Sequence, residues 1–234
     1  MKKILKDNYI WIILFSSLIG LISLIVCVFL KENLILDEKG YYLISKLIND
    51  NITPIVKTIT FLASTTFFIG LSILLFILIK NKKIGLSIII NLSLSALTNF
   101  ILKNIIQRPR PIGYRLIKET GYSLPSGHSM VSMAFYGYLI YLICKYIKNK
   151  KIKICLTIFL SLLILLVGLS RIYLGVHYTT DVLAGYLLGL IYLIVFIKAF
   201  IGPFPELDFL ILFPSISKVT STVVVLFASS SVIL

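Results

Sequence analysis

The amino-acid sequence predicts an all-α, polytopic membrane protein whose six transmembrane helices form a bundle. Of its 234 residues, 59% are hydrophobic and only 14% are charged, and the mean hydropathy is +1.03. A water-soluble fold of this composition would expose much apolar surface, at a cost of about 25 cal/mol per Å², whereas a bilayer removes that cost. The apolar residues also fall into six runs, each long enough to cross the hydrocarbon as a helix of about 20 residues.

More polar segments separate the six predicted spans. Lys2 and Lys3 precede the first span, as in a signal peptide, but its apolar run is too long and no small-residue cleavage site follows. We therefore interpret it as a retained helix. The predicted spans are Tyr9–Leu30, Thr58–Ile79, Ile84–Leu102, Ser129–Ile147, Ile154–Tyr173 and Val182–Ala199.

Lysine clusters predict how these helices are oriented. Three clusters fall on one side of a six-helix topology, and the positive-inside rule makes that side cytoplasmic. They are Lys2, Lys3 and Lys6; Lys80, Lys82 and Lys83; and Lys145, Lys148, Lys150, Lys151 and Lys153. The outer segment between the third and fourth spans breaks the rule, because its five basic residues face only one acidic residue, Glu119. Function is therefore expected at the outer, non-cytoplasmic face.

Domain extent, net charge and the cysteines narrow the possible functions of the chain. Residues 1–202 are interpreted as one transmembrane domain, and residues 203–234, with three prolines, as a C-terminal appendage without an assigned role. The net charge of +14 does not indicate a nucleic-acid partner, since the basic residues lie in short clusters between apolar runs. The three cysteines lie in or beside apolar segments at unrelated spacings, which favours core packing over a metal site or a disulfide.

Arginine and histidine are scarce in this chain and concentrate at the predicted outer face. There are four arginines and two histidines, although lysine otherwise supplies most of the positive charge. The planar guanidinium binds phosphate oxygens in a bidentate manner, which lysine cannot do. Three stretches carry all of these residues except Arg115, and the predicted topology brings the stretches together. They are Lys103-x6-Arg110-Pro111, Pro125-Ser126-Gly127-His128, and Ser170-Arg171-x5-His177-x3-Asp181.

Each stretch has a functional and a structural interpretation. Ser126 is placed to cap a helix whose positive end would attract an anion, and Gly127 allows close approach of the backbone to a ligand. A helix beginning near His177 would place Asp181 one turn away, so that the carboxylate accepts the Nδ1 proton and leaves Nε2 as a lone pair. The structural alternatives are snorkelling basic residues, an ordinary capped helix and a buried polar pair.

The order and spacing of the three stretches resemble the tripartite signature of the type-2 phosphatidic acid phosphatase superfamily. This superfamily includes bacterial membrane lipid phosphatases and vanadium-dependent haloperoxidases, and the resemblance covers about residues 58–200. It implies that His177 is a nucleophile that forms a phosphohistidine, that Asp181 orients it, and that His128 is the general acid and base. The implied phosphate-binding residues are Lys103, Arg110, Ser126, Gly127 and Arg171.

The resemblance also implies a substrate and a location. The expected substrate is a lipid phosphate or diphosphate, in the order undecaprenyl diphosphate, phosphatidylglycerol phosphate and phosphatidic acid, in a bacterial plasma membrane. No metal or cofactor is expected, because a two-metal site would need several carboxylates and only Asp181 and Glu119 lie near the motifs. Two alternatives are a vanadate-dependent haloperoxidase and a transporter or flippase that binds lipid phosphate without cleaving it. The exact lipid and the oligomeric state are left open.

Overall fold

The computed structural model describes residues 2–30, 34–113 and 115–201, and this part of the chain is helical, without strands. The all-α prediction is therefore confirmed for these residues. The predicted appendage, 203–234, lies outside them. The helices are α1 (Lys2–Leu30), α2 (Ile35–Ser45), α3 (Ile52–Phe61), α4 (Thr65–Leu78), α5 (Lys82–Ile106), α6 (Gly127–Tyr146), α7 (Lys150–Tyr173) and α8 (Thr179–Phe196), followed by a π-helical turn, Ile197–Ile201.

Five of the described helices are long and apolar enough to cross a membrane: α1, α5, α6, α7 and α8 with its π-helical extension. The pair α3 and α4 would add a sixth span. The prediction of a single helix over 58–79 is wrong, because the chain breaks after Phe61 and bends by 51°. Ser64 is extended there, and its hydroxyl accepts the backbone N–H of Phe67 at 3.2 Å, so it caps a new helix.

Other helix boundaries differ from the predicted ones because polar residues belong to the first turns. Asn81 caps α5 by accepting the N–H of Lys83 at 3.1 Å. Asn149 caps α7 by accepting the N–H of Lys151 at 3.0 Å. A prediction from hydropathy excludes such lysine-bearing turns. For the same reason it missed α2, a helix of lower hydropathy in the segment predicted to be an outer loop.

Helix α6 lies at the centre of the bundle and packs against α5, α7 and α8. Two glycines of α8, spaced four residues apart, allow it to approach α6 closely, as small residues do in membrane helix pairs. A Cβ atom on Gly185 would lie 2.8 Å from the carbonyl oxygen of Ser126, and one on Gly189 would lie 2.6 Å from that of Met130. This contact determines how the start of α8 lies relative to the start of α6.

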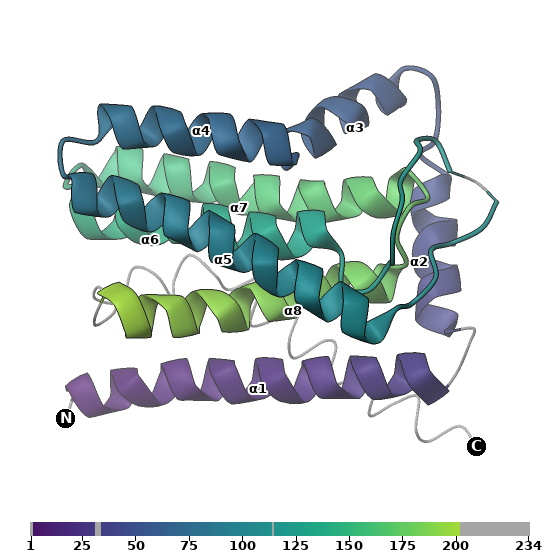
Figure 1. Cartoon of the computed structure of the whole chain (residues 1–234), viewed down its shortest axis with the longest axis horizontal. Helices are drawn as coiled ribbons and strands as arrows, with labels where there is room; N and C mark the ends of the chain where they lie inside the picture. Colours follow the sequence, from purple (N-terminus) through teal and green to yellow (C-terminus); the bar gives the residue numbers. More distant parts are fainter. Residues whose placement is uncertain (1, 31–33, 114, 202–234) are drawn as a thin grey trace.

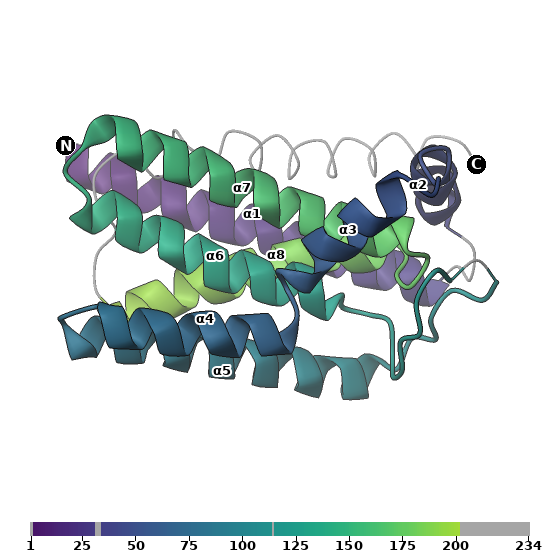
Figure 2. The ribbon, with the colours of Figure 1, turned by 90° about the horizontal axis from the view of Figure 1, so that it is seen from above.

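The two ends of the bundle differ in character. Figure 1 shows the long helices side by side, with α2 lying across one end. The segment between α5 and α6 and the turn between α7 and α8 lie at this same end (Figure 2). The α4–α5 and α6–α7 connections, where two of the lysine clusters are located, lie at the opposite end (Figure 1). The three predicted motifs are therefore at or near one end of the bundle.

Candidate active site

The end of α5 determines how the first motif leaves the helix. Gln107 ends α5 in the left-handed region, with φ 54°. The two prolines that flank Arg110 have no N–H group with which to extend the helix. Arg110 then closes the following loop on itself, since its Nε and Nη2 donate at 3.0 Å to the carbonyl oxygens of Gly121 and Thr120. The guanidinium is therefore held by backbone groups.

The turn between α7 and α8 presents His177. Gly175 has φ 68°, a left-handed conformation that glycine adopts without steric cost, and the chain reverses there. His177 follows, only 3% exposed. Helix α8 begins at Thr179 with Tyr178 as its N-cap, so His177 lies just before the helix, near the predicted start. Asp181 still reaches the imidazole, since its carboxylate turns back over the helix N-terminus and accepts the N–H of Tyr178 at 2.9 Å.

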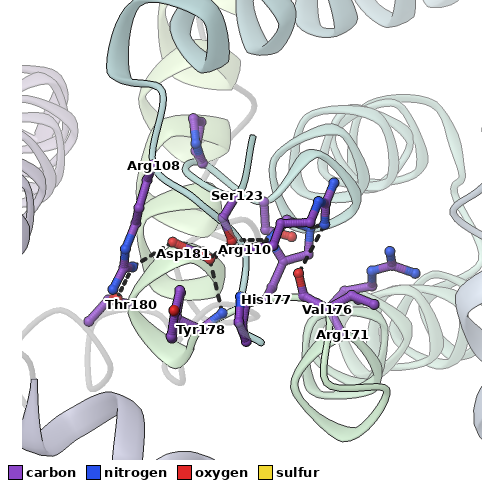
Figure 3. A network of polar contacts seen from close by, with 12 residues as sticks. Arg108, Arg110, Ser123, Arg171, Val176, His177, Tyr178, Thr180 and Asp181 are labelled. Atoms are coloured by element: carbon purple, nitrogen blue, oxygen red, sulfur yellow. Dashed lines mark hydrogen bonds and ion pairs between the residues drawn. The ribbon is translucent and has the colours of Figure 1, made fainter. Parts of the chain in front are cut away.

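The two nitrogens of the His177 ring have different partners (Figure 3). Nδ1 lies 3.4 Å from Asp181 Oδ2 and 3.4 Å from Ser123 Oγ. Nε2 lies 3.0 Å from Nη1 of Arg110. Because a guanidinium only donates hydrogen bonds, Nε2 must accept, and the ring proton must be on Nδ1, facing the carboxylate. This is the tautomer that the sequence predicted, but the lone pair is bonded to Arg110 and not free.

Burial keeps the His177 ring uncharged. The pKa of His177 is lowered from 6.5 to about 4, mainly because burial removes the imidazolium from water; Asp181 opposes this change, and the charges of Arg110 and Arg171 add to it. The imidazole is therefore neutral at pH 7. A neutral ring with its proton on Nδ1 is the form that presents a nucleophilic nitrogen.

Asp181 is held from several sides. Arg108 Nη1 donates to Oδ1 at 2.7 Å, and the hydroxyl of Ser123 donates to Oδ2 in a short hydrogen bond. The backbone carbonyl of Asp181 accepts the N–H of Ser126 at 3.0 Å, which ties the start of α8 to the start of α6. The carboxylate is completely buried. Its orientation toward His177 is therefore determined by two side chains of the α5–α6 segment and by the backbone N–H of Tyr178.

Arg171 and Arg110 share a carboxylate. Arg171 lies in the last turn of α7 and is 1% exposed; its Nη2 is 2.5 Å from Glu119 Oε1 and its Nη1 is 2.8 Å from Thr60 Oγ1. Glu119 Oε2 also lies 3.8 Å from Arg110 Nη2. Although burial alone would raise it, Arg171 holds the pKa of Glu119 below its ordinary value, so this side chain is an anion at neutral pH.

One donor of Arg171 has no partner within the described chain. Its Nε is buried and makes no hydrogen bond there. A buried, unsatisfied N–H of a charged group is costly, and a ligand that accepts from it would remove that cost. Together with the Glu119 contact, this donor makes Arg171 a candidate residue for binding an anion with several oxygens.

Lys103 lies in the last turn of α5, facing the same loop. Its Nζ donates to the carbonyl oxygen of Tyr122 at 2.7 Å, and it interacts electrostatically with Arg110, Asp181, Glu119 and Arg171. The structure thus brings Lys103 to the cluster, where it holds the loop backbone.

The second motif begins α6 as predicted. Ser126 is the N-cap; its Oγ accepts the N–H of Ser129 at 3.4 Å and the hydroxyl of Ser129 at 2.9 Å. Gly127 packs against α5, since a Cβ there would lie 2.9 Å from Asn99 Oδ1. His128 follows in the first turn and interacts electrostatically with the charged residues and the other histidine of the site. These partners are Arg171, His177, Lys103 and Arg110.

Four site residues were not predicted from the sequence. Arg108, Glu119 and Asp37 are noticeable in the sequence only for their charge, while Ser123 gives no signal. Asp37 belongs to α2 and reaches Arg108 at 2.8 Å. Among the described residues, no group of three histidine, cysteine, aspartate or glutamate side chains is arranged to hold a metal ion.

Several known proteins resemble this chain in sequence. The sequence profile of the PAP2 superfamily matches residues 83–202. Phosphatidylglycerophosphatase B of Bacillus subtilis is 40% identical over 111 residues, which are 46% of this chain; the match spans about half, 53%, of that relative's length. Undecaprenyl-diphosphatase of Sulfolobus acidocaldarius is 30% identical over 198 residues, which are 79% of this chain and 88% of that protein.

Solved structures show the same fold. The PAP2-type phosphatidylglycerolphosphate phosphatase from Bacillus subtilis superposes with a TM-score of 0.72 at 28% identity, covering 79% of this chain and 94% of that one. Aquifex aeolicus LpxE gives a TM-score of 0.59 at 26% identity, covering 71% and 98%. The family resemblance of the three motifs is thereby confirmed: this chain belongs to the PAP2 superfamily.

Proposed function

We propose that this protein is a membrane lipid phosphatase that hydrolyses a lipid phosphate or diphosphate through a phosphohistidine intermediate. The observation that carries the proposal is the His177 environment: a buried, neutral imidazole whose Nδ1 faces Asp181 and whose Nε2 faces Arg110. The relatives described above are named as phosphatases of lipid phosphates and diphosphates.

The first step would transfer the phosphoryl group to His177. Its Nε2 lone pair attacks phosphorus, the N–P bond forms, and the bond from phosphorus to the lipid-side oxygen breaks. Asp181 stabilises the positive charge that develops on the ring, because it lies against Nδ1–H. His128 donates a proton to the leaving oxygen.

The second step would release phosphate. His128, now neutral, takes a proton from water as the water oxygen attacks phosphorus. The N–P bond breaks, its electron pair returns to Nε2, and inorganic phosphate leaves. Both steps depend mainly on neutralising the negative charge of the phosphoryl oxygens. Arg110 and Arg171 would supply the positive charge, while Lys103, Ser126 and the Gly127 N–H complete the predicted phosphate-binding set.

The substrate would be an amphiphile whose phosphate reaches the end of the bundle while its tail stays in lipid. We retain the substrate order undecaprenyl diphosphate, phosphatidylglycerol phosphate and phosphatidic acid. We also propose six membrane crossings, with α3 and α4 forming one bent span, and a site outside the cytoplasm. The positive-inside rule supports this orientation, since two lysine clusters connect helices at the opposite end from His177.

A panel of phosphorylated lipids, assayed for phosphate release by purified protein, tests the proposal. We expect release from at least one lipid, retention of activity with chelator, inhibition by vanadate, and loss of activity in His177→Ala. A His177→Ala protein that folds and still hydrolyses substrate would refute the nucleophile. Halide oxidation dependent on vanadate would instead favour a haloperoxidase, and lipid transfer without hydrolysis would favour a transporter.

A further inference from the structure

Asp37 connects the short helix α2 to the candidate active site. It is far from the three motifs in sequence, yet its carboxylate is only 6% exposed. Oδ2 accepts from Arg108 Nη2 at 2.8 Å and from Thr180 Oγ1 at 3.0 Å. Oδ1 accepts the backbone N–H of Thr180 at 2.8 Å. This N–H is in the first turn of α8, where helices leave donors unsatisfied and where a negative charge is favourable.

Arg108 continues the connection to Asp181. Its Nη2 binds Asp37, whereas its Nη1 donates to Asp181 Oδ1 at 2.7 Å and to Thr180 Oγ1 at 2.8 Å (Figure 3 shows the contacts of Arg108 with Thr180 and Asp181). The guanidinium carbon lies 4.0 Å from the centre of the Tyr178 ring. The cation–π contact with Tyr178 and the two carboxylate contacts together leave Arg108 little rotational freedom.

We propose that Asp37, acting through Arg108, is a positioning residue for the nucleophile: it sets the orientation and the charge with which Asp181 faces His177. The proposal rests on the proposed function. Asp37 touches no reacting atom and is not a catalytic residue. It is the far end of a continuous chain from Asp37 to Arg108, Asp181 and His177.

The physical reason is the sharing of one positive charge between two buried carboxylates. If Arg108 interacted with Asp181 alone, the positive charge of Arg108 would offset the negative charge of Asp181. Asp181 would then stabilise the His177 cation less. Because Asp37 takes one side of the guanidinium, Asp181 retains more negative charge for Nδ1–H. Arg108 still fixes Oδ1, which leaves Oδ2 directed at the imidazole.

A purely structural role would not require the contact with Arg108. If Asp37 only held α2 against α8, its two hydrogen bonds with Thr180 would be sufficient. The contact through Arg108 adds the link to Asp181. The structural and positioning roles therefore differ in what the loss of the Asp37 charge does to His177.

Steady-state kinetics of Asp37→Asn test the proposal. Asparagine keeps the shape of the side chain and removes its charge. We expect kcat to fall by about tenfold, with KM within about twofold of the wild type, because transition-state stabilisation is lost and substrate binding is not. Glu38→Gln is the matched control: the same charge change, on the same helix, at an exposed position. It should leave both constants within about twofold.

Nuclear magnetic resonance of ¹⁵N-histidine-labelled protein gives a readout that does not depend on turnover. The chain has only two histidines, so a His128→Gln protein assigns the His177 signals directly. We expect the Nδ1–H tautomer to dominate in the wild type and in Glu38→Gln, and to be reduced in Asp37→Asn. If the wild type hydrolysed no phosphorylated lipid, the proposed function would fail, and the tautomer comparison would still decide the role of Asp37.

Several results would overturn the proposal. One is an Asp37→Asn protein that matches Glu38→Gln in kcat and in the His177 tautomer. Another is a fall in kcat without any change at His177, or a change in KM alone. If Asp37→Asn does not fold, Arg108→Lys takes its place, because a single ammonium cannot make the planar bridge between both carboxylates. An Arg108→Lys protein with wild-type kcat and tautomer would equally contradict the proposal.

Discussion

Nη1 of Arg110 lies 3.0 Å from Nε2 of His177 and 2.9 Å from the carbonyl oxygen of Val176. The nitrogen that we propose attacks phosphorus is therefore hydrogen-bonded to Arg110. For attack to occur, this N–H must leave Nε2. A phosphate oxygen that accepts from Arg110 would provide the alternative partner, so that substrate binding and exposure of the nucleophile would be the same event.

This relationship predicts the outcome of shortening Arg110. In Arg110→Lys the positive charge remains, but the planar fork that reaches Nε2 and phosphate together is lost. We expect kcat/KM for phosphate release to fall by about 100-fold, since contacts to a charged oxygen are worth about 1.5–3 kcal/mol. Arg115→Lys, an exposed arginine of the same loop, is the control. Similar activity in the two variants would show that Arg110 does not contact the substrate.

The low pKa of His177 predicts the acid limb of activity. With a pKa of about 4, His177 stays neutral as the pH falls from 7 to 5, so the nucleophile remains available in this range. The loss of kcat/KM caused by His177 should then be centred near pH 4, where an exposed histidine would give a loss near 6.5. The pH profile of phosphate release tests this. The prediction is contradicted if the acid limb lies near pH 6.5 and its midpoint is the same in Arg110→Gln as in the wild type.

The same shift predicts how stability depends on pH. The folded-state pKa of His177, about 4, is lower than the ordinary value of 6.5, so between these values the unfolded chain binds a proton that the folded chain does not. This contribution to the free energy of unfolding is present above pH 6.5 and is lost as the pH falls toward 4. Thermal unfolding in detergent at pH 7 and pH 4.5 should therefore show a smaller change in His177→Gln than in the wild type.

Glu119 predicts an effect on anion binding. Its carboxylate forms an ion pair with Arg171 Nη2 and lies near Arg110. These are the donors that we propose bind a phosphate oxygen. In Glu119→Gln the competing charge is gone, and inorganic phosphate or vanadate should inhibit phosphate release with a Ki about tenfold lower, which corresponds to about 1.4 kcal/mol. Glu38→Gln controls for the change in net charge. An unchanged or higher Ki would show that Glu119 does not compete for this position.

The α6–α8 contact predicts a stability difference between two glycines. Gly189→Ala places a Cβ 2.6 Å from the Met130 carbonyl oxygen, whereas a Cβ on Gly70 has no atom within 4 Å. We expect Gly189→Ala to destabilise the protein by about 1–3 kcal/mol through overpacking. Gly70→Ala should be neutral or slightly stabilising, because alanine has the higher helix propensity. Unfolding midpoints in detergent distinguish the two, and equal midpoints would contradict the close approach.

Much of the architecture follows from local properties of the chain. Hydropathy over about 20 residues is sufficient to predict a membrane helix, which is why α1, α5, α6, α7 and α8 were all predicted. Residue type was similarly informative at the site, because arginine and histidine are scarce in this chain and Arg110, Arg171 and His177 are among the few. The cap at Ser126 is local as well, and it was predicted correctly.

The sequence by itself therefore determined the membrane class, the helices of the core, the family signature and the candidate nucleophile with its carboxylate. Only the tertiary structure decided what surrounds them: the break between α3 and α4, the bond from Arg110 to Nε2, the carboxylate of Glu119 beside Arg171, and the link from Asp37. The physical reason is range. Hydropathy and capping act between neighbours along the chain, whereas Asp37 meets Arg108 across 71 positions and Thr180 across 143, and only packing brings such residues together.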